Sequence, residues 1–135
     1  MQKTLSVIDL KAIKENALKI RKILGDKFFY AVVKADAYGH GAEEVARTVE
    51  DIVDGFCVAI VDEGVALRIG GVSKPILVFT PPLDKSDVAR SSFYSLELTV
   101  NSVETARLCG DNPCHIKVNT GMNRNGCNLA ELPKV

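Results

Sequence analysis

The chain has 135 residues with 17 basic and 17 acidic side chains, so its formal net charge is zero, and charge gives no reason to expect nucleic acid or an anionic membrane surface as a partner. Its hydrophobic content of 47% and charged content of 25% are ordinary for a soluble globular domain. No apolar run approaches the roughly 18 residues of a membrane span, and the N-terminus lacks a signal-peptide core, so we expect a cytoplasmic protein.

The first predicted element is an amphipathic helix over residues 9–24. Its apolar residues step by three and four along the chain, which places them on one stripe of the helix surface. The members of that stripe are Leu10, Ile13, Ala17, Ile20 and Leu24. Asp9 is a suitable N-cap for this helix, and Gly25 is a suitable stop.

The stretch Phe28–Gly41, FFYAVVKADAYGHG, follows the helix and organises the rest of the chain. Its first six residues are apolar and rich in strand formers, Lys34 ends this predicted strand, and a glycine-bearing turn leads into a helix. In parallel α/β folds, ligands bind at the carboxyl ends of strands. A lysine that loses hydration there has a lowered pKa, and its neutral amine can attack a carbonyl to form a Schiff base.

The same stretch also offers groups for an anion. Gly39 and Gly41 let the backbone come close to a phosphate, and the following helix points its amide dipoles at it. Tyr38 can donate its hydroxyl to the same anion. A lysine that can react with an aldehyde, next to a phosphate-binding site, indicates pyridoxal phosphate (PLP). The alternative is that Lys34 is a solvated side chain, which is more common for a lysine at a strand end.

Strands and helices alternate along the remaining chain. The predicted helices cover 42–51, 63–69, 86–91 and 102–109, and the predicted strands cover 56–61, 76–80, 95–101 and 115–119. This alternation indicates βαβ units and a parallel sheet. No G-x-G-x-x-G follows a strand, so we favour a (β/α)8 barrel of the TIM type over a doubly wound sheet. Because a complete barrel takes about 250 residues, we expect only its first five strands here.

The fifth predicted strand opens a second informative stretch, HIKVNTGMNRNG, which ends at Gly126. Alternation places His115, Lys117 and Asn119 on one face of the strand. Buried polar groups need partners, so this face belongs either at a ligand-facing barrel mouth or on an exposed edge strand. Arg124 follows in a loop, where its guanidinium can reach an anion or a phenolate.

The chain contains four cysteines, at positions 57, 109, 114 and 127. Their spacings match no common zinc pattern. We therefore expect no metal site, and we expect these residues to be reduced thiols that act as small apolar packing residues.

The sequences of these stretches resemble those of one protein family. V-V-K-A-D-A-Y-G-H-G, which contains Lys34, is similar to the PLP-lysine motif of the alanine racemases, V-V-K-A-[ND]-A-Y-G-H-G. The fifth-strand stretch is similar to the family's [HL]-x-K-V-[DN]-T-G-M-[GN]-R-[LM]-G. Other stretches agree in order, so the resemblance covers essentially all 135 residues. Two positions depart from the pattern: Asn125 replaces leucine or methionine, and Asn119 stands where aspartate is commoner.

The resemblance implies a role for each matched residue. Lys34 forms the Schiff base with PLP and serves as a base on one face of the substrate Cα. Tyr38 binds the cofactor phosphate. Arg124 lies beside the cofactor's phenolic oxygen and the substrate carboxylate. Lys117 corresponds to a lysine that is carbamylated in many members and holds that arginine in place.

At the level of the whole protein, the resemblance implies a fold-type III PLP enzyme that interconverts L- and D-alanine, supplies D-alanine for peptidoglycan and forms a homodimer. Residues 1–135 are then the N-terminal part of its PLP-binding barrel domain, without the C-terminal β-domain, and we expect this polypeptide alone to be inactive. Two alternatives stay open. One is a non-catalytic PLP-binding barrel protein that manages the cofactor, and the other is a racemase for serine or another small amino acid.

Overall fold

The computed structural model describes residues 4–135. The expectation that the N-terminus lacks a signal peptide falls partly on residues 1–3, which lie outside the described residues. The described chain alternates between helices and strands in the predicted order. The elements are α1 (Leu10–Leu24), β1 (Tyr30–Val32), α2 (Lys34–Gly39), α3 (Ala42–Val49), β2 (Gly55–Val58), α4 (Val61–Ile69), β3 (Ile76–Val78), α5 (Lys85–Phe93), β4 (Leu98–Val100), α6 (Val103–Cys109), β5 (Cys114–Ile116) and a final 3-10 helix (Leu132–Lys134).

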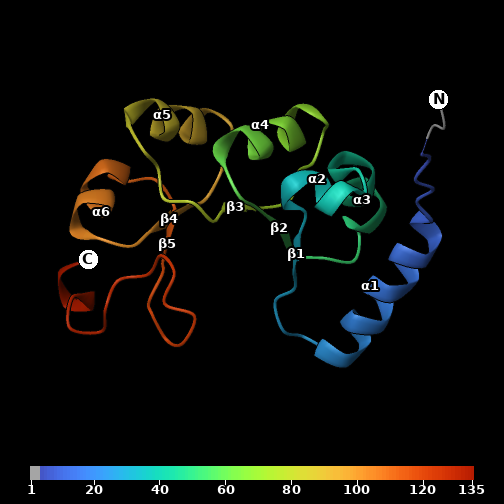
Figure 1. The fold of residues 1–135 in the computed structure, drawn as a ribbon, viewed down its shortest axis with the longest axis horizontal. Coiled ribbons are helices and arrows are strands. Elements are labelled where there is room, and N and C mark those ends of the chain that lie inside the picture. The colour runs from blue at the N-terminus through green and yellow to red at the C-terminus, as the bar shows by residue number, and fades with distance from the viewer. Residues whose placement is uncertain (1–3) are drawn as a thin grey trace.

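The strands are parallel and lie in sequence order. β1 pairs with β2, β2 with β3, and β4 with β5. Hydrogen bonds join β3 to the start of β4, because the Val78 N–H donates to the Glu97 carbonyl over 2.9 Å and the Glu97 N–H donates to the Ile76 carbonyl over 2.8 Å. Helices α1 and α3 to α6 follow one another around the outside of this row of strands (Figure 1). The predicted parallel α/β architecture, a partial barrel of five strands, is confirmed.

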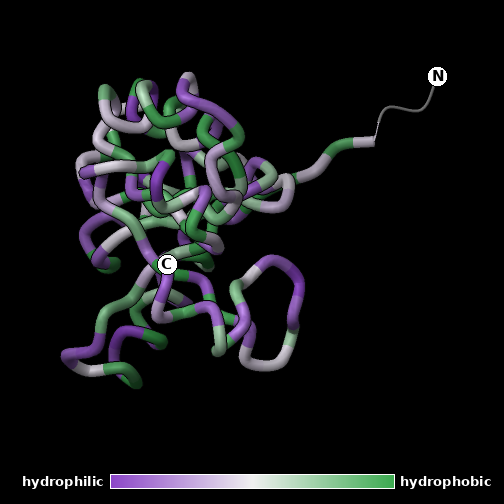
Figure 2. Tube along the Cα trace, turned by 90° about the vertical axis from the view of Figure 1, so that its left-hand side faces the viewer, coloured by the Kyte–Doolittle hydropathy of each residue, from purple (hydrophilic) through white to green (hydrophobic). Residues whose placement is uncertain are grey.

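The hydrophobic core lies between the strands and their covering helices. Every second strand residue faces the helices, and six of these are at most 1% exposed: Phe56, Val58, Ile76, Val78, Leu98 and Val100. On the helix side, Ala46, Val49 and Leu67 are equally well buried, at no more than 2% exposed. Hydrophobic and hydrophilic residues alternate along the coils of the tube in Figure 2, as expected for elements that bury one face.

The first helix begins and ends where the sequence predicts. The Asp9 carboxylate accepts from the Ala12 N–H over 3.0 Å, and the Gly25 N–H donates to the Arg21 carbonyl over 3.0 Å. The apolar stripe faces β1 and α3, but it is not fully covered. Ile20 is 43% exposed because it lines an open apolar groove between α1 and β1.

Two expectations about local structure are corrected. The first strand is shorter than predicted, because it begins at Tyr30, and Phe28 before it is 85% exposed. The Phe29 N–H is bound by the Asp54 carboxylate over 2.7 Å. The four cysteines are free thiols, and three of them are buried as packing residues. Cys114 is exposed, since it starts β5, which in the described chain pairs only with β4 along its length.

Candidate functional site

Lys34 follows β1 directly, at the carboxyl end of the strand. The Val33 N–H donates to the Cys57 carbonyl over 2.9 Å, which is the last β1–β2 contact before the chain turns. Val33 is 2% exposed, so the residue before the lysine is fixed in the core. The Lys34 ammonium lies 5.8 Å from the centre of the Tyr38 ring. The two residues predicted to bind an aldehyde and a phosphate are thus neighbours, and Tyr38 is 63% exposed.

The turn between these residues differs from the predicted glycine-bearing turn. Ala35, Asp36, Ala37 and Tyr38 have φ values from 49° to 56°, so four successive residues with a Cβ adopt the left-handed helical conformation. Each such residue costs roughly 1–2 kcal/mol, so the surrounding structure must hold the turn. The Ala37 N–H donates to the Val33 carbonyl over 2.9 Å, and the Asp36 carboxylate accepts from the Ala42 N–H over 2.8 Å.

The two predicted glycines come after the left-handed turn. Gly39 and Gly41 have φ values of 85° and 87°, which an L-residue rarely adopts. A Cβ at Gly41 would lie 2.7 Å from a carboxylate oxygen of Glu44. The glycines therefore lead the chain from the turn into α3, as the motif indicated, but they do not form the part of the turn beside Lys34.

Glu63 is a residue of this site that the sequence analysis missed. One of its carboxylate oxygens accepts from the Ala35 N–H over 2.7 Å, and the other accepts from the Ala59 N–H over 2.6 Å. A signal was present, because a glutamate at the third position of a helix commonly reaches back to backbone amides that precede the helix. Here the N-cap is Ile60, which has no side-chain acceptor to offer.

The second group of predicted residues lies on the strands further along. Lys117 and Arg124 line one cavity of about 230 Å³ together with Phe79, Thr99 and His115. The Lys117 ammonium donates to the Val118 carbonyl over 3.2 Å. His115 and Lys117 thus line one cavity, but Ile116 between them lines it as well, so the lining does not separate the two faces that alternation predicts. His115 and Lys117 are both cavity-lining and exposed, which combines the two interpretations left open from the sequence.

A cluster of titratable side chains also gathers around Glu97, just before β4, and includes residues of β1, β2 and β5. His115 Nε2 lies 2.8 Å from a Glu97 carboxylate oxygen. Burial raises the pKa of Tyr30, and the Glu97 charge raises it further. Burial also raises the pKa of the Cys57 thiol to about 11, with a smaller contribution from Glu97. The Tyr30 phenol and the Cys57 thiol are thus protonated near neutral pH.

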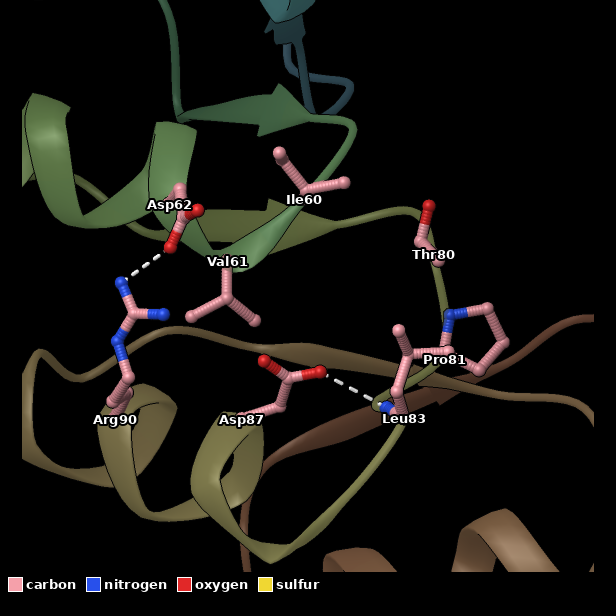
Figure 3. A pocket seen from close by; sticks show the side chains of 8 residues that line it. All are labelled: Ile60, Val61, Asp62, Thr80, Pro81, Leu83, Asp87 and Arg90. Carbon is pink, nitrogen blue, oxygen red and sulfur yellow. Dashed lines mark hydrogen bonds and ion pairs between the residues drawn. The ribbon is translucent and has the colours of Figure 1, made fainter.

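Another cavity, of about 190 Å³, lies where β2 and β3 end, beside α4 and α5 (Figure 3). Its charged side chains are engaged within the protein. Asp62 and Arg90 point toward one another over 2.5 Å, and the Asp87 carboxylate accepts from the Leu83 N–H over 3.0 Å. The Asp62–Arg90 pair joins α4 to α5, and none of the predicted site residues lines this cavity.

Two further observations concern the described part of the chain only. Residues 4–135 contain no group of three or more histidine, cysteine, aspartate or glutamate side chains placed to hold a metal ion. Among the helices of the same residues, none is long and apolar enough to cross a membrane.

Comparison with known sequences identifies the family. The model of the alanine racemase N-terminal domain matches residues 8–135. The alanine racemase of Streptococcus agalactiae serotype Ia is 43% identical over 131 residues, which cover 91% of this chain and 36% of that protein. The Alcanivorax borkumensis alanine racemase is 40% identical over 130 residues, which cover 93% of this chain and 37% of the relative. The chain thus spans little more than a third of the length of these curated relatives.

Solved structures agree with the sequence comparison. Alanine racemase from E. faecalis superposes with a TM-score of 0.81 at 38% identity, over 89% of this chain and 35% of that structure. The biosynthetic alanine racemase from Pseudomonas aeruginosa gives 0.86 at 32% identity, over 93% of this chain and 37% of that structure. Because the family model matches nearly the whole chain, the chain belongs to the alanine racemase N-terminal domain family.

Proposed function

We propose that this chain is the cofactor-binding barrel portion of a PLP-dependent racemase that interconverts L- and D-alanine and supplies D-alanine for peptidoglycan. The names of the relatives support this activity. Because the chain spans 36% of the Streptococcus agalactiae relative, the activity is proposed for the whole protein. The observation that carries the proposal is Lys34 at the end of a parallel strand, with its ammonium 5.8 Å from the Tyr38 ring.

The residues at the end of β1 suit PLP. Lys34 supplies an amine for the cofactor's aldehyde, and the accessible Tyr38 hydroxyl supplies a donor for its phosphate. Gly39 and Gly41 leave the backbone free of side chains where the turn meets α3. When bound, PLP acts as an electron sink that stabilises a carbanion at the substrate Cα.

The chain's own residues then have distinct tasks. Lys34 would hold the cofactor and would move a proton between its Nζ and the substrate Cα on one face. Tyr38 would orient the phosphate by donating its hydroxyl. As the family resemblance implies, the Arg124 guanidinium would donate to the cofactor's phenolic oxygen and to the substrate carboxylate.

Lys117 is assigned to the support of Arg124. Both side chains line the same cavity, and two cations there repel one another more strongly as water is excluded. Carbamylation would convert the Lys117 amine into an anion. The repulsion would then become an ion pair that holds the Arg124 guanidinium.

Racemisation needs a base on each face of the substrate Cα, and Lys34 serves one face. We assign the second base, the partner of the pyridine nitrogen and further phosphate donors to parts of the protein other than residues 1–135. As the family resemblance implies, we propose that the second base is a tyrosine in a C-terminal β-domain of a partner subunit. A second base on a partner subunit requires a homodimer. The proposal also includes a small amino-acid substrate and a cytoplasmic location.

The experiment is reductive trapping. The chain is incubated with PLP, treated with borohydride and digested, and the modified peptides are mapped by mass spectrometry. We expect the pyridoxyl group on Lys34, and Lys34→Ala should remove it while Lys27→Ala, at an exposed position before β1, should not. Label concentrated on any other lysine would overturn the assignment.

For the whole protein, the conversion of L-alanine compared with L-serine tests the substrate, and no racemisation of either would favour a non-catalytic PLP carrier.

A further inference from the structure

We infer that Glu63 is a positioning residue for Lys34: its carboxylate fixes the left-handed turn from which the Lys34 side chain leaves β1. The inference rests on the proposed function only in that it takes Lys34 as the cofactor lysine. The contacts of Glu63 stand without that assignment.

Glu63 lies in the first turn of α4 and binds the ends of two neighbouring strands. Its Oε1 accepts from the Ala35 N–H over 2.7 Å, and its Oε2 accepts from the Ala59 N–H over 2.6 Å. Hydrogen bonds to an ionised carboxylate are shorter and stronger than neutral ones. The N-terminal end of a helix also favours a negative charge. The carboxylate is therefore held at the point where the β1 and β2 chains separate.

The bond to Ala35 replaces strand pairing at the residue where it stops. The Val33 N–H is still paired with β2, through the Cys57 carbonyl over 2.9 Å. Two residues later, the Ala35 N–H is bound by Glu63 instead of by a strand carbonyl. Ala35 is also the first residue of the left-handed turn, with φ 49° and ψ 50°. Glu63 thus fixes the peptide that joins Lys34 to the strained turn.

Glu63 acts through the backbone and not on the reacting atoms. Both of its oxygens are occupied by backbone N–H groups. Its side chain lines a cavity of about 250 Å³ on the helix side of the sheet, beside Val33 and Val58, whose side chains are buried under the helices. Loss of the carboxylate would leave the Ala35 N–H without its acceptor. The turn could then relax toward the right-handed conformation that alanine prefers, which would redirect the Lys34 side chain.

Glu43 provides a matched control. It lines the same cavity and carries the same charge, but its carboxylate pairs with Arg47 one helical turn further along α3. Replacing Glu43 by Gln removes one charge from the cavity while leaving the contacts to Ala35 and Ala59 in place. Any effect of cavity charge alone appears in both variants.

The experiment compares Glu63→Gln with Glu43→Gln in the 135-residue chain without cofactor, and then with PLP. Hydrogen–deuterium exchange read by mass spectrometry reports on the Ala35 and Ala59 amides. Glutamine keeps a single acceptor oxygen, so Glu63→Gln leaves at least one of the two amides without its acceptor. We expect exchange at that amide to speed up by about tenfold or more, as for the loss of a charge-assisted bond. Exchange in the buried strands β2 and β3 should be unchanged, as it should be throughout Glu43→Gln. After borohydride reduction with PLP, the share of label on Lys34 should fall severalfold in Glu63→Gln only.

These readouts separate positioning from a general loss of stability, which would speed exchange throughout the sheet and raise labelling of many lysines. Unchanged exchange at both Ala35 and Ala59 in a folded Glu63→Gln variant, or an unchanged share of label on Lys34, would overturn the inference. If Glu63→Gln does not fold, Glu63→Asp keeps the charge but is too short to reach both amides, and it should restore the fold with intermediate exchange and labelling. Equal behaviour of Glu63→Asp and the unaltered chain would also contradict the inference.

If the unaltered chain shows no label on Lys34, the proposed function fails, while the exchange data still test Glu63.

Discussion

The side-chain amide of Asn119 binds both backbone groups of Gly126. Its oxygen accepts from the Gly126 N–H over 3.0 Å, and its nitrogen donates to the Gly126 carbonyl over 2.7 Å. A Cβ at position 126 would lie 2.7 Å from the backbone nitrogen of Asn119 and 2.7 Å from the carbonyl carbon of Val118. Only glycine allows the two segments to approach so closely. The pair closes the loop that carries Arg124, and it connects a departure from the family pattern with the placement of a proposed site residue.

Replacing Asn119 by Asp should loosen this loop. Aspartate keeps the acceptor for the Gly126 N–H, but it loses the donor and sets a negative charge against the Gly126 carbonyl. We expect a destabilisation of about 1–2 kcal/mol, typical of a lost hydrogen bond with an acceptor left unpaired. Thermal unfolding and deuterium exchange over residues 119–127 measure the change. Asn123→Asp, at an exposed position of the same loop, should have little effect, and equal effects of both changes would contradict the explanation.

The order of the elements could be predicted from local patterns because the relevant signals lie close in sequence. Ser102 caps α6 by accepting from the Thr105 N–H over 3.2 Å, and Gly110 ends it with its N–H on the Ala106 carbonyl over 3.2 Å. The sequence predicts a helix over 102–109, and these two contacts lie at its ends. Lys34 was likewise found at the end of its strand, because an apolar run followed by a lysine is a contiguous pattern.

The left-handed turn could not be predicted in this way. Its residues Ala35 to Tyr38 include no glycine, so the motif favoured a turn at Gly39 to Gly41. The contact that holds Ala35 comes from Glu63, 28 residues further along the chain. A backbone conformation fixed by so distant a side chain is decided by tertiary structure. The start of the first strand also involves a distant contact, since the carboxylate of Asp54, 25 residues further along, accepts from the Phe29 N–H.

The contact between Arg21 and Asp54 should make the stability depend on pH. The hydrogen bond from the Arg21 guanidinium, and then that from the Phe29 N–H, hold the pKa of Asp54 below its ordinary value. A lowered folded pKa gives stability that is present above the unfolded pKa, about 3.9, and is lost as the pH falls through the folded pKa. Asp54→Asn should therefore lower the unfolding temperature at pH 6, and the difference from the unaltered chain should shrink below about pH 4.

Thermal unfolding between pH 7 and pH 2.5 measures this difference. Asp26→Asn serves as the control, because Asp26 is exposed in the loop just before β1. It should shift the curve little at any of these pH values. A destabilisation by Asp54→Asn that stays constant down to pH 2.5 would contradict the role assigned to the ionised carboxylate.

Lys117 should take up carbon dioxide if the proposed support of Arg124 is correct. The two side chains line one cavity of about 230 Å³, and a carbamate would replace their repulsion by attraction. In ¹³C-bicarbonate we expect a carbamate carbon resonance that disappears in Lys117→Ala and persists in Lys134→Ala. Arg124→Gln should weaken that resonance, because the carbamate then lacks its cationic partner. A spectrum without a carbamate signal in the unaltered chain, saturated with bicarbonate and PLP, would refute the assignment.

The last prediction concerns the second base. Residues 1–135 place one proposed base at the substrate Cα, Lys34. The phenol of Tyr30 is held protonated, because burial and then the Glu97 charge raise its pKa. The polypeptide of residues 1–135, loaded with PLP, should therefore exchange the α-proton of L-alanine with D₂O on one face without forming D-alanine. Mass spectrometry follows the deuterium, and chiral chromatography follows the enantiomers.

Lys34→Ala should abolish the exchange, since it removes the group that moves the proton. A failure of the unaltered polypeptide to exchange deuterium would count against Lys34 as the base, even if PLP were attached to it.

Formation of D-alanine at an enzymatic rate would show that a second base lies within these 135 residues. Tyr30, Tyr38, His40 and His115 would then be the residues to replace one at a time. Of these, Tyr38 is exposed and its ring centre lies 5.8 Å from the Lys34 ammonium, but a phenol that binds the phosphate is occupied and is not free to take a proton from Cα. His115 is engaged with Glu97 over 2.8 Å, so its replacement would also release that carboxylate, and Glu97→Gln would be needed to separate the two effects.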